Sequence, residues 1–150
     1  MSYVNNKNII AIKKQSAFTF LELLLVVLII SILSAASAPF FSRFLLQNAV
    51  SSSSEHIVST LRKAQEYTIA GKNNSTWQAV LSGSTLTLVQ QSGGTVFDTY
   101  TMNSNVAVSG LTTVSFTRPL GQIASPVSIS ISAGSNSKNV SVNTEGVVSY

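Results

Sequence analysis

The chain has no cysteine, a single histidine and only five acidic residues among its 150 residues. Without cysteine, a thiol nucleophile, a disulfide and a cysteine-ligated zinc site are excluded. His56 stands alone, so it has no second histidine for a catalytic dyad. The acids show no paired spacing of the kind used by a glycosidase or a calcium loop; they are Glu22, Glu55, Glu66, Asp98 and Glu145. We therefore expect no enzymatic activity, no cofactor and no metal site.

Positive charge is concentrated at the N-terminus. Residues Met1–Ala17 contain Lys7, Lys13 and Lys14 and no acid. The formal net charge is +4 for the whole chain but only +1 for the residues after Ala17. The basic character thus belongs largely to this leader, and it is poor evidence for a nucleic-acid-binding surface.

A long apolar run follows the leader. It extends over 24 residues from Phe18 to Phe41, and Glu22 is the only charged residue in it. As a helix it would measure about 36 Å, compared with a hydrocarbon core of about 30 Å. We expect it to cross a membrane, and the basic leader predicts a cytoplasmic N-terminus with the residues after Phe41 on the outside.

The position of Glu22 is unusual for a plain membrane anchor or a secretory signal. A carboxylate near the bilayer centre costs about 2.5–3.5 kcal/mol, and less toward the edge, so it calls for a partner. Ala36-Ser37-Ala38 has the pattern of a signal-peptidase site. Cleavage there would leave Pro39, which has no N–H and a fixed φ, as the first residue after the cut. We therefore disfavour ordinary secretion.

The stretch Ala17-Phe18-Thr19-Phe20-Leu21-Glu22, followed by an apolar helix, resembles the class III signal of type IV pilins and type II secretion pseudopilins. The resemblance implies that the prepilin peptidase cuts between Ala17 and Phe18 and methylates the new amine of Phe18. Glu22 then becomes the fifth mature residue, and Pro39 falls where pilins commonly carry a helix-kinking proline. The family usually has glycine before the cut, where this chain has Ala17.

Cleavage would give Glu22 a partner. The new amine of Phe18 is a positive charge at the same membrane depth as the Glu22 carboxylate. If the amine and the carboxylate of adjacent subunits pair, both desolvation penalties are relieved and the stagger of neighbouring helices is fixed. Glu22 and Pro39 are accordingly predicted as assembly residues.

Beyond Pro39 the helical pattern continues, and we expect one long helix over 20–70, bent or loosened near Pro39. Its second half is amphipathic, with apolar residues at helical spacing, and Gly71 is expected to cap it. After residue 74 the apolar period changes to two, with glycine and serine turns between the runs, which predicts antiparallel strands. The fold class is α+β, divided into a leader (1–17), a spanning helix (18–41), an amphipathic helix (42–72) and a β domain (73–150).

Two C-terminal segments carry a second resemblance. Residues 114–121 (VSFTRPLG) and 138–146 (KNVSVNTEG) are similar to the closing strands of the GspH/FimT group of minor pseudopilins and pilins. The two resemblances together imply a minor structural subunit of a type IV pilus or a type II secretion pseudopilus. Its implied partners are the prepilin peptidase, other pilin or pseudopilin subunits and an inner-membrane assembly platform. The implied location is the inner membrane, with the C-terminal domain in the periplasm, and later a periplasmic or extracellular filament.

Two alternatives stay open at this point. A FimT-type pilin that captures DNA would need clustered cations, which the fold would have to supply by bringing Arg118 and Lys138 together. A single-pass anchored surface domain with no filament role would instead retain Met1–Ala17.

Overall fold

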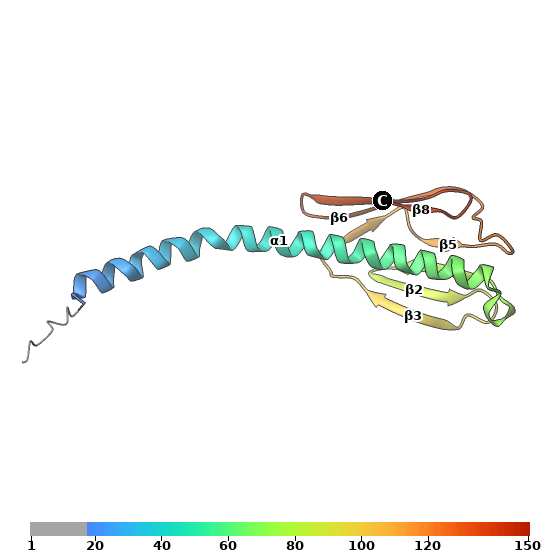
Figure 1. Ribbon diagram of the computed structural model, residues 1–150, viewed down its shortest axis with the longest axis horizontal. Coiled ribbons are helices and arrows are strands. Elements are labelled where there is room, and N and C mark those ends of the chain that lie inside the picture. Colours follow the sequence, from blue (N-terminus) through green and yellow to red (C-terminus); the bar gives the residue numbers. More distant parts are fainter. Residues whose placement is uncertain (1–17) are drawn as a thin grey trace, which may run out of the picture. The chain divides into compact units, whose positions relative to one another are not determined.

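The computed structural model describes residues 18–150, without the side chains of residues 38 and 39. Helix α1 covers Phe20–Ile69, and a short 3₁₀ helix, η1, covers Lys72–Asn74. Antiparallel strands follow (Figure 1). The predicted α+β class, one long N-terminal helix followed by antiparallel sheets, is confirmed. The chain divides into two compact units at residues 38 and 39, and each is described by itself.

In the first unit, the apolar part of α1 is uncovered. Every described side chain from Phe18 to Ser37 is exposed, and the large apolar ones retain 43–79% of their accessible surface. Among the described residues, α1 is the one helix long and apolar enough to cross a membrane by length and composition. An apolar surface of this extent is expected to be covered by lipid or by other helices.

Three serines in this part of α1 satisfy their hydroxyls within the helix. Each hydroxyl donates to the carbonyl four residues earlier, at 2.7–2.8 Å: Ser31 to Val27, Ser34 to Ile30 and Ser37 to Leu33. Because of these bonds, the serines need no polar partner from outside the helix.

The second unit begins with the amphipathic part of α1. Its predicted apolar stripe is buried, with Val50, Ile57, Leu61 and Ala64 at most 2% exposed. The helix ends at Ile69, one residue before the predicted end. Gly71 then takes a left-handed conformation (φ 63°) and donates its N–H to the carbonyl of Thr68 at 3.1 Å. The bend at Pro39 stays a prediction, because the side chain of this residue is not described.

The strands form two four-stranded antiparallel sheets. The first has the order β3-β2-β1-β5, and the second has the order β4-β6-β7-β8. The strands of the first sheet are β1 (Trp77–Ser82), β2 (Thr85–Gln90), β3 (Val96–Thr101) and β5 (Thr113–Ser115). Those of the second are β4 (Ala107–Ser109), β6 (Val127–Ala133), β7 (Asn136–Val142) and β8 (Val148–Ser149). In the view of Figure 1, β2 and β3 lie on one side of α1 and β6 and β8 lie on the other.

One hydrophobic core joins α1 to both sheets. Its largest fully buried side chains are Trp77 and Phe116. The helix contributes the stripe described above, and the sheets contribute the inward-facing residues Ala79, Leu86, Leu88, Val114, Ile129, Ile131, Ala133, Val140, Val142 and Val148. All of this core lies between residues 50 and 148, so the second unit has a core of its own.

An aromatic cluster packs at the C-terminal end of α1. The rings of Tyr67, Trp77 and Phe97 meet edge to face, with centroids 5.2–5.8 Å apart. The ammonium of Lys72 lies 3.6 Å from the ring centroid of Tyr67 and 3.9 Å from that of Phe97. Cation–π contacts of this kind tie the residues after the helix to strand β3.

Candidate functional site

The start of α1 is fixed by Thr19. The backbone N–H of Glu22 donates to the Thr19 hydroxyl at 3.3 Å, and the N–H of Leu23 donates to the Thr19 carbonyl at 3.2 Å. Thr19 therefore acts as the N-cap, with Glu22 at the third helical position. The sequence reasoning missed this role of Thr19, although the T-x-x-E spacing was its signal.

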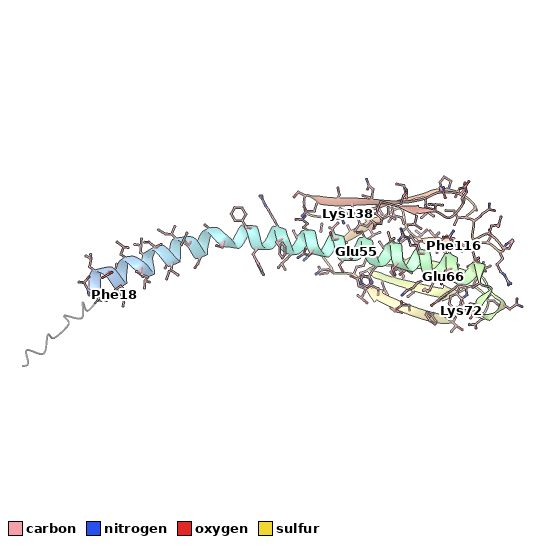
Figure 2. All side chains as sticks on the ribbon, viewed as in Figure 1. Phe18, Glu55, Glu66, Lys72, Phe116 and Lys138 are labelled. Atoms are coloured by element: carbon pink, nitrogen blue, oxygen red, sulfur yellow. The ribbon has the colours of Figure 1, made fainter. Side chains whose placement is uncertain are left out.

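Phe18 (Figure 2) precedes the helix and Glu22 lies in its first turn, and both side chains are exposed. The side chain of Glu22 forms no ion pair within residues 18–150. The helix dipole favours an acid in this first turn, but nothing within the described chain neutralises the carboxylate. The predicted cleavage site cannot be placed in full, because Ala17 lies outside the described residues.

The fold does not bring Arg118 and Lys138 into one hollow. Arg118 donates from Nη1 to Oδ1 of Asn74 at 3.1 Å, in a polar hollow beside η1. Lys138 lies on β7 and lines a different hollow of about 350 Å³ along α1. Figure 2 shows Lys138 close to Glu55, toward the other end of this part of α1.

The hollow at Lys138 contains both signs of charge. Arg62 and Lys63 of α1 line it together with Lys138, and so do Glu55 and Glu66. The sequence reasoning missed this grouping. The period of α1 puts these four helical residues on one face, but only the fold shows that β7 lies beside that face. The two acids reduce the positive potential that a phosphate backbone would require.

No group of three or more His, Asp or Glu side chains in the described part of the chain could hold a metal ion. His56 is exposed and stacks on Tyr100, with ring centroids 3.7 Å apart. This geometry makes His56 a packing contact between α1 and β3.

The described chain has an exposed apolar helix with an acid in its first turn, followed along the sequence by an α+β unit. This layout is consistent with a pilin-like fold. Residues 12–38 match the family model described as the prokaryotic N-terminal methylation motif. This match includes the predicted cleavage site and the first part of α1. No curated protein and no solved structure matches the chain.

The motif supports a type IV pilin-like protein that is processed as a prepilin, and it implies the prepilin peptidase and other pilin subunits as partners. The apolar helix and the motif are both consistent with an inner-membrane anchor. Pilin-type proteins are structural rather than enzymatic.

Proposed function

We propose that the protein is a structural subunit of a type IV pilus or a type II secretion pseudopilus. In this proposal it is cleaved between Ala17 and Phe18, methylated at Phe18 and assembled through the helix over 18–41. One observation carries the proposal: the match to the methylation motif overlaps the apolar part of α1, whose side chains are not buried by any of the described residues.

The electrostatics of assembly depend on Glu22. Lipid and a helix bundle are similarly apolar, so moving α1 between them gains little from the hydrophobic effect. Packing and ion pairing must supply the preference for the bundle. Phe18 precedes the helix, and Glu22 lies in its first turn. A neighbour shifted along the helix axis would bring its Phe18 amine to the Glu22 carboxylate.

The first test is the N-terminus of the protein extracted from membranes. We expect Edman degradation and intact mass to show a chain that begins at Phe18 and carries one N-methyl group. An intact Met1 would support the plain anchored domain, and a start at Pro39 would support ordinary secretion. Either result would remove the proposed function.

The second test replaces Glu22. Glu22→Gln keeps the size of the side chain and removes its charge, so membrane insertion and cleavage should be normal while recovery in sheared filaments falls at least tenfold. Glu145→Gln removes an exposed carboxylate from the second unit and is the matched control. Normal incorporation of Glu22→Gln would contradict the pairing.

The finer assignment is to a minor subunit of the GspH/FimT group, with its C-terminal domain in the periplasm and an inner-membrane platform as a partner. The resemblance of residues 114–121 and 138–146 to that group supports it. Quantitative mass spectrometry of purified filaments is the test. A minor subunit should make up a few per cent or less of the pilin, and a dominant share would contradict the assignment.

DNA capture is a second candidate because Arg62, Lys63 and Lys138 line one hollow. A mobility shift with the full chain in detergent would test it at low and moderate salt. Retardation that weakens with salt, and weakens further in Lys138→Glu, would support it. No retardation at low salt would remove it.

A further inference from the structure

Among the sheet edges of the second unit, those at β3 and at β7 are of different kinds. Strand β3 is the outer strand of its sheet, and it pairs only with β2, at five of its six residues, because a register shift leaves out Phe97. Strand β7 is partly covered, because β8 pairs only with Ser141 and Val142. The stretch 136–140 of β7 therefore also has an outer edge without a partner among the described strands.

Strand β3 is only partly protected as an edge, by its register shift against β2 and by the α1-facing charge of Asp98. It contains no lysine and no proline, and Val96 and Phe97 remain 54% and 52% exposed. Such an edge is a template for another strand unless something covers it. Its one charged residue is Asp98, whose side chain is 48% exposed although it pairs with Lys63 at 3.1 Å.

Strand β3 runs against the direction of α1. Near its start, Phe97 contacts Tyr67 with ring centroids 5.3 Å apart. Near its end, Tyr100 stacks on His56, eleven residues earlier in the helix. The chain direction of β3 is thus opposite to that of the helix it packs on.

Strand β7 runs in the direction of α1. The turn before it lies at the early part of the helix, where Gly134 is next to Leu46. The turn after it lies further along, where the side-chain amide of Gln65 donates to the Glu145 carbonyl at 3.4 Å. The β3 and β7 edges therefore run in opposite directions relative to α1.

The two edges carry charges of opposite sign, and both charged side chains lie on the α1-facing side of their sheet. Asp98 points toward α1, since it pairs with Lys63. Lys138 also lies on the α1 side of its sheet, because it lines the hollow with residues of that helix. Lys138 forms no ion pair within residues 18–150.

We propose that the β3 edge of one copy adds to the β7 edge of a second copy, with Asp98 opposite Lys138. The inference rests on the proposed function, because copies that enter one helix bundle from the same membrane share one chain direction. Two such copies placed side by side bring β3 and β7 together as antiparallel strands, with the α1-facing sides of both sheets aligned. The pairing needs only two adjoining copies. Because the two edges differ, the contact is heterologous, and each of the two copies keeps its other edge free for a different neighbour.

The pairing specifies an offset between the two copies. Asp98 lies at the level of Lys63, and Lys138 lies close to Glu55 (Figure 2). Eight helical residues separate these two levels, about 12 Å. A neighbour displaced axially by about this distance would place the two charges opposite each other.

Cross-linking tests the register directly, because the chain has no cysteine of its own. With Asp98 opposite Lys138 in an antiparallel ladder, Thr99 lies opposite Ser137. Two tagged copies of the full chain, one Thr99→Cys and the other Ser137→Cys, are expressed together and oxidised in intact cells. We expect a disulfide-linked dimer that contains both tags. The matched control pairs Thr99→Cys with Ser109→Cys, which lies on the opposite edge of the second sheet.

Charge reversal provides a second readout. Lys138→Glu in the Ser137→Cys copy places like charges opposite each other, so the yield of the mixed dimer should fall about threefold or more. Lys138 is exposed and not part of the core, so this variant should fold normally. A yield that does not change, or a control dimer as abundant as the test dimer, would overturn the inference.

The same cells report the proposed function separately, through cleavage before Phe18 and recovery of the chain in sheared filaments. Processed chain in filaments without the mixed dimer would overturn the edge pairing and leave the proposed function standing. A chain that is neither cleaved nor recovered in filaments would overturn the proposed function itself.

Discussion

Gly146 and Gly83 form a matched pair for measuring how tightly the loops are packed against α1. Both have positive φ, 83° and 59°. A Cβ at Gly83 would meet nothing within 4 Å, whereas a Cβ at Gly146 would overlap the carbonyl oxygen of Gly121 and Nε2 of Gln65. The Gln65 amide donates to the Gly121 carbonyl at 3.1 Å. Gly146 therefore lies where the loops containing Gly121 and Gly146 contact α1.

The two alanine variants should therefore differ in free energy of unfolding. Left-handed backbone costs about 1–2 kcal/mol for alanine, and the reduced freedom of the unfolded chain returns about 0.4–1 kcal/mol. Gly83→Ala should thus lose about 1 kcal/mol. Gly146→Ala adds about 1–3 kcal/mol of overpacking and about 1 kcal/mol for the disturbed hydrogen bond. Its total loss should be about 3 kcal/mol or more.

Thermal unfolding of the full chain in detergent, followed by near-ultraviolet circular dichroism, would measure the difference. At about 4 °C per kcal/mol for a domain of this size, Tm should fall by about 4 °C in Gly83→Ala and by about 12 °C in Gly146→Ala. Equal shifts in the two variants would refute the reasoning, because they would mean that only the backbone conformation matters at Gly146.

Two further stability predictions come from polar groups of the second unit. Ser53 is 1% exposed, and its hydroxyl is the one buried side-chain oxygen in the described residues without a hydrogen-bond partner. Ser53→Ala should leave stability unchanged or raise it by about 1 kcal/mol, and a clear loss in denaturant titration would contradict this. Lys72→Met keeps the stem and removes the charge from the aromatic cluster, so it should lose about 0.5–2 kcal/mol. A double-mutant cycle with Phe97→Leu should show coupling of about 0.5 kcal/mol or more, and additive losses would exclude the cation–π contact with that ring.

Much of the fold could be predicted from the sequence because its signals are local. The spacing of Val50, Ile57 and Leu61 defined the buried face of α1, and these side chains are buried. Gly83 and Gly134 marked turns, and both connect paired strands. At each of these positions, one residue type meets one local requirement, which is either a buried helix face or a turn.

The apolar pattern of the sequence does not indicate strand β3, and the reason is physical. Its α1-facing positions carry Asp98 and Tyr100, which contact Lys63 and His56. An edge strand held by an ion pair and a ring stack does not show the apolar alternation expected of a half-buried strand. A register shift in its pairing with β2 interrupts the period as well. The two-residue strand β8 is too short to produce a pattern.

The candidate site also has one part that the sequence predicts and one part that it does not. Glu22 could be found from sequence because one charge in a long apolar run is conspicuous, and its role stays a prediction. The hollow at Lys138 could not be found, because it combines Arg62 of the helix with a strand 76 residues further along. Only the tertiary fold brings such residues together.

The intrahelical hydrogen bonds of Ser31, Ser34 and Ser37 have a consequence for the release of a subunit from a filament. Since each already donates within its own helix, a subunit leaving a filament would break no serine-mediated bridge to its neighbours. Return to the bilayer would then be opposed mainly by shape complementarity and by the single charge pair near the N-terminus. In a filament assembled as proposed, a departing protomer would thus leave no serine hydroxyl unpaired in the bilayer, and the pair formed by Glu22 would be the polar contact that breaks.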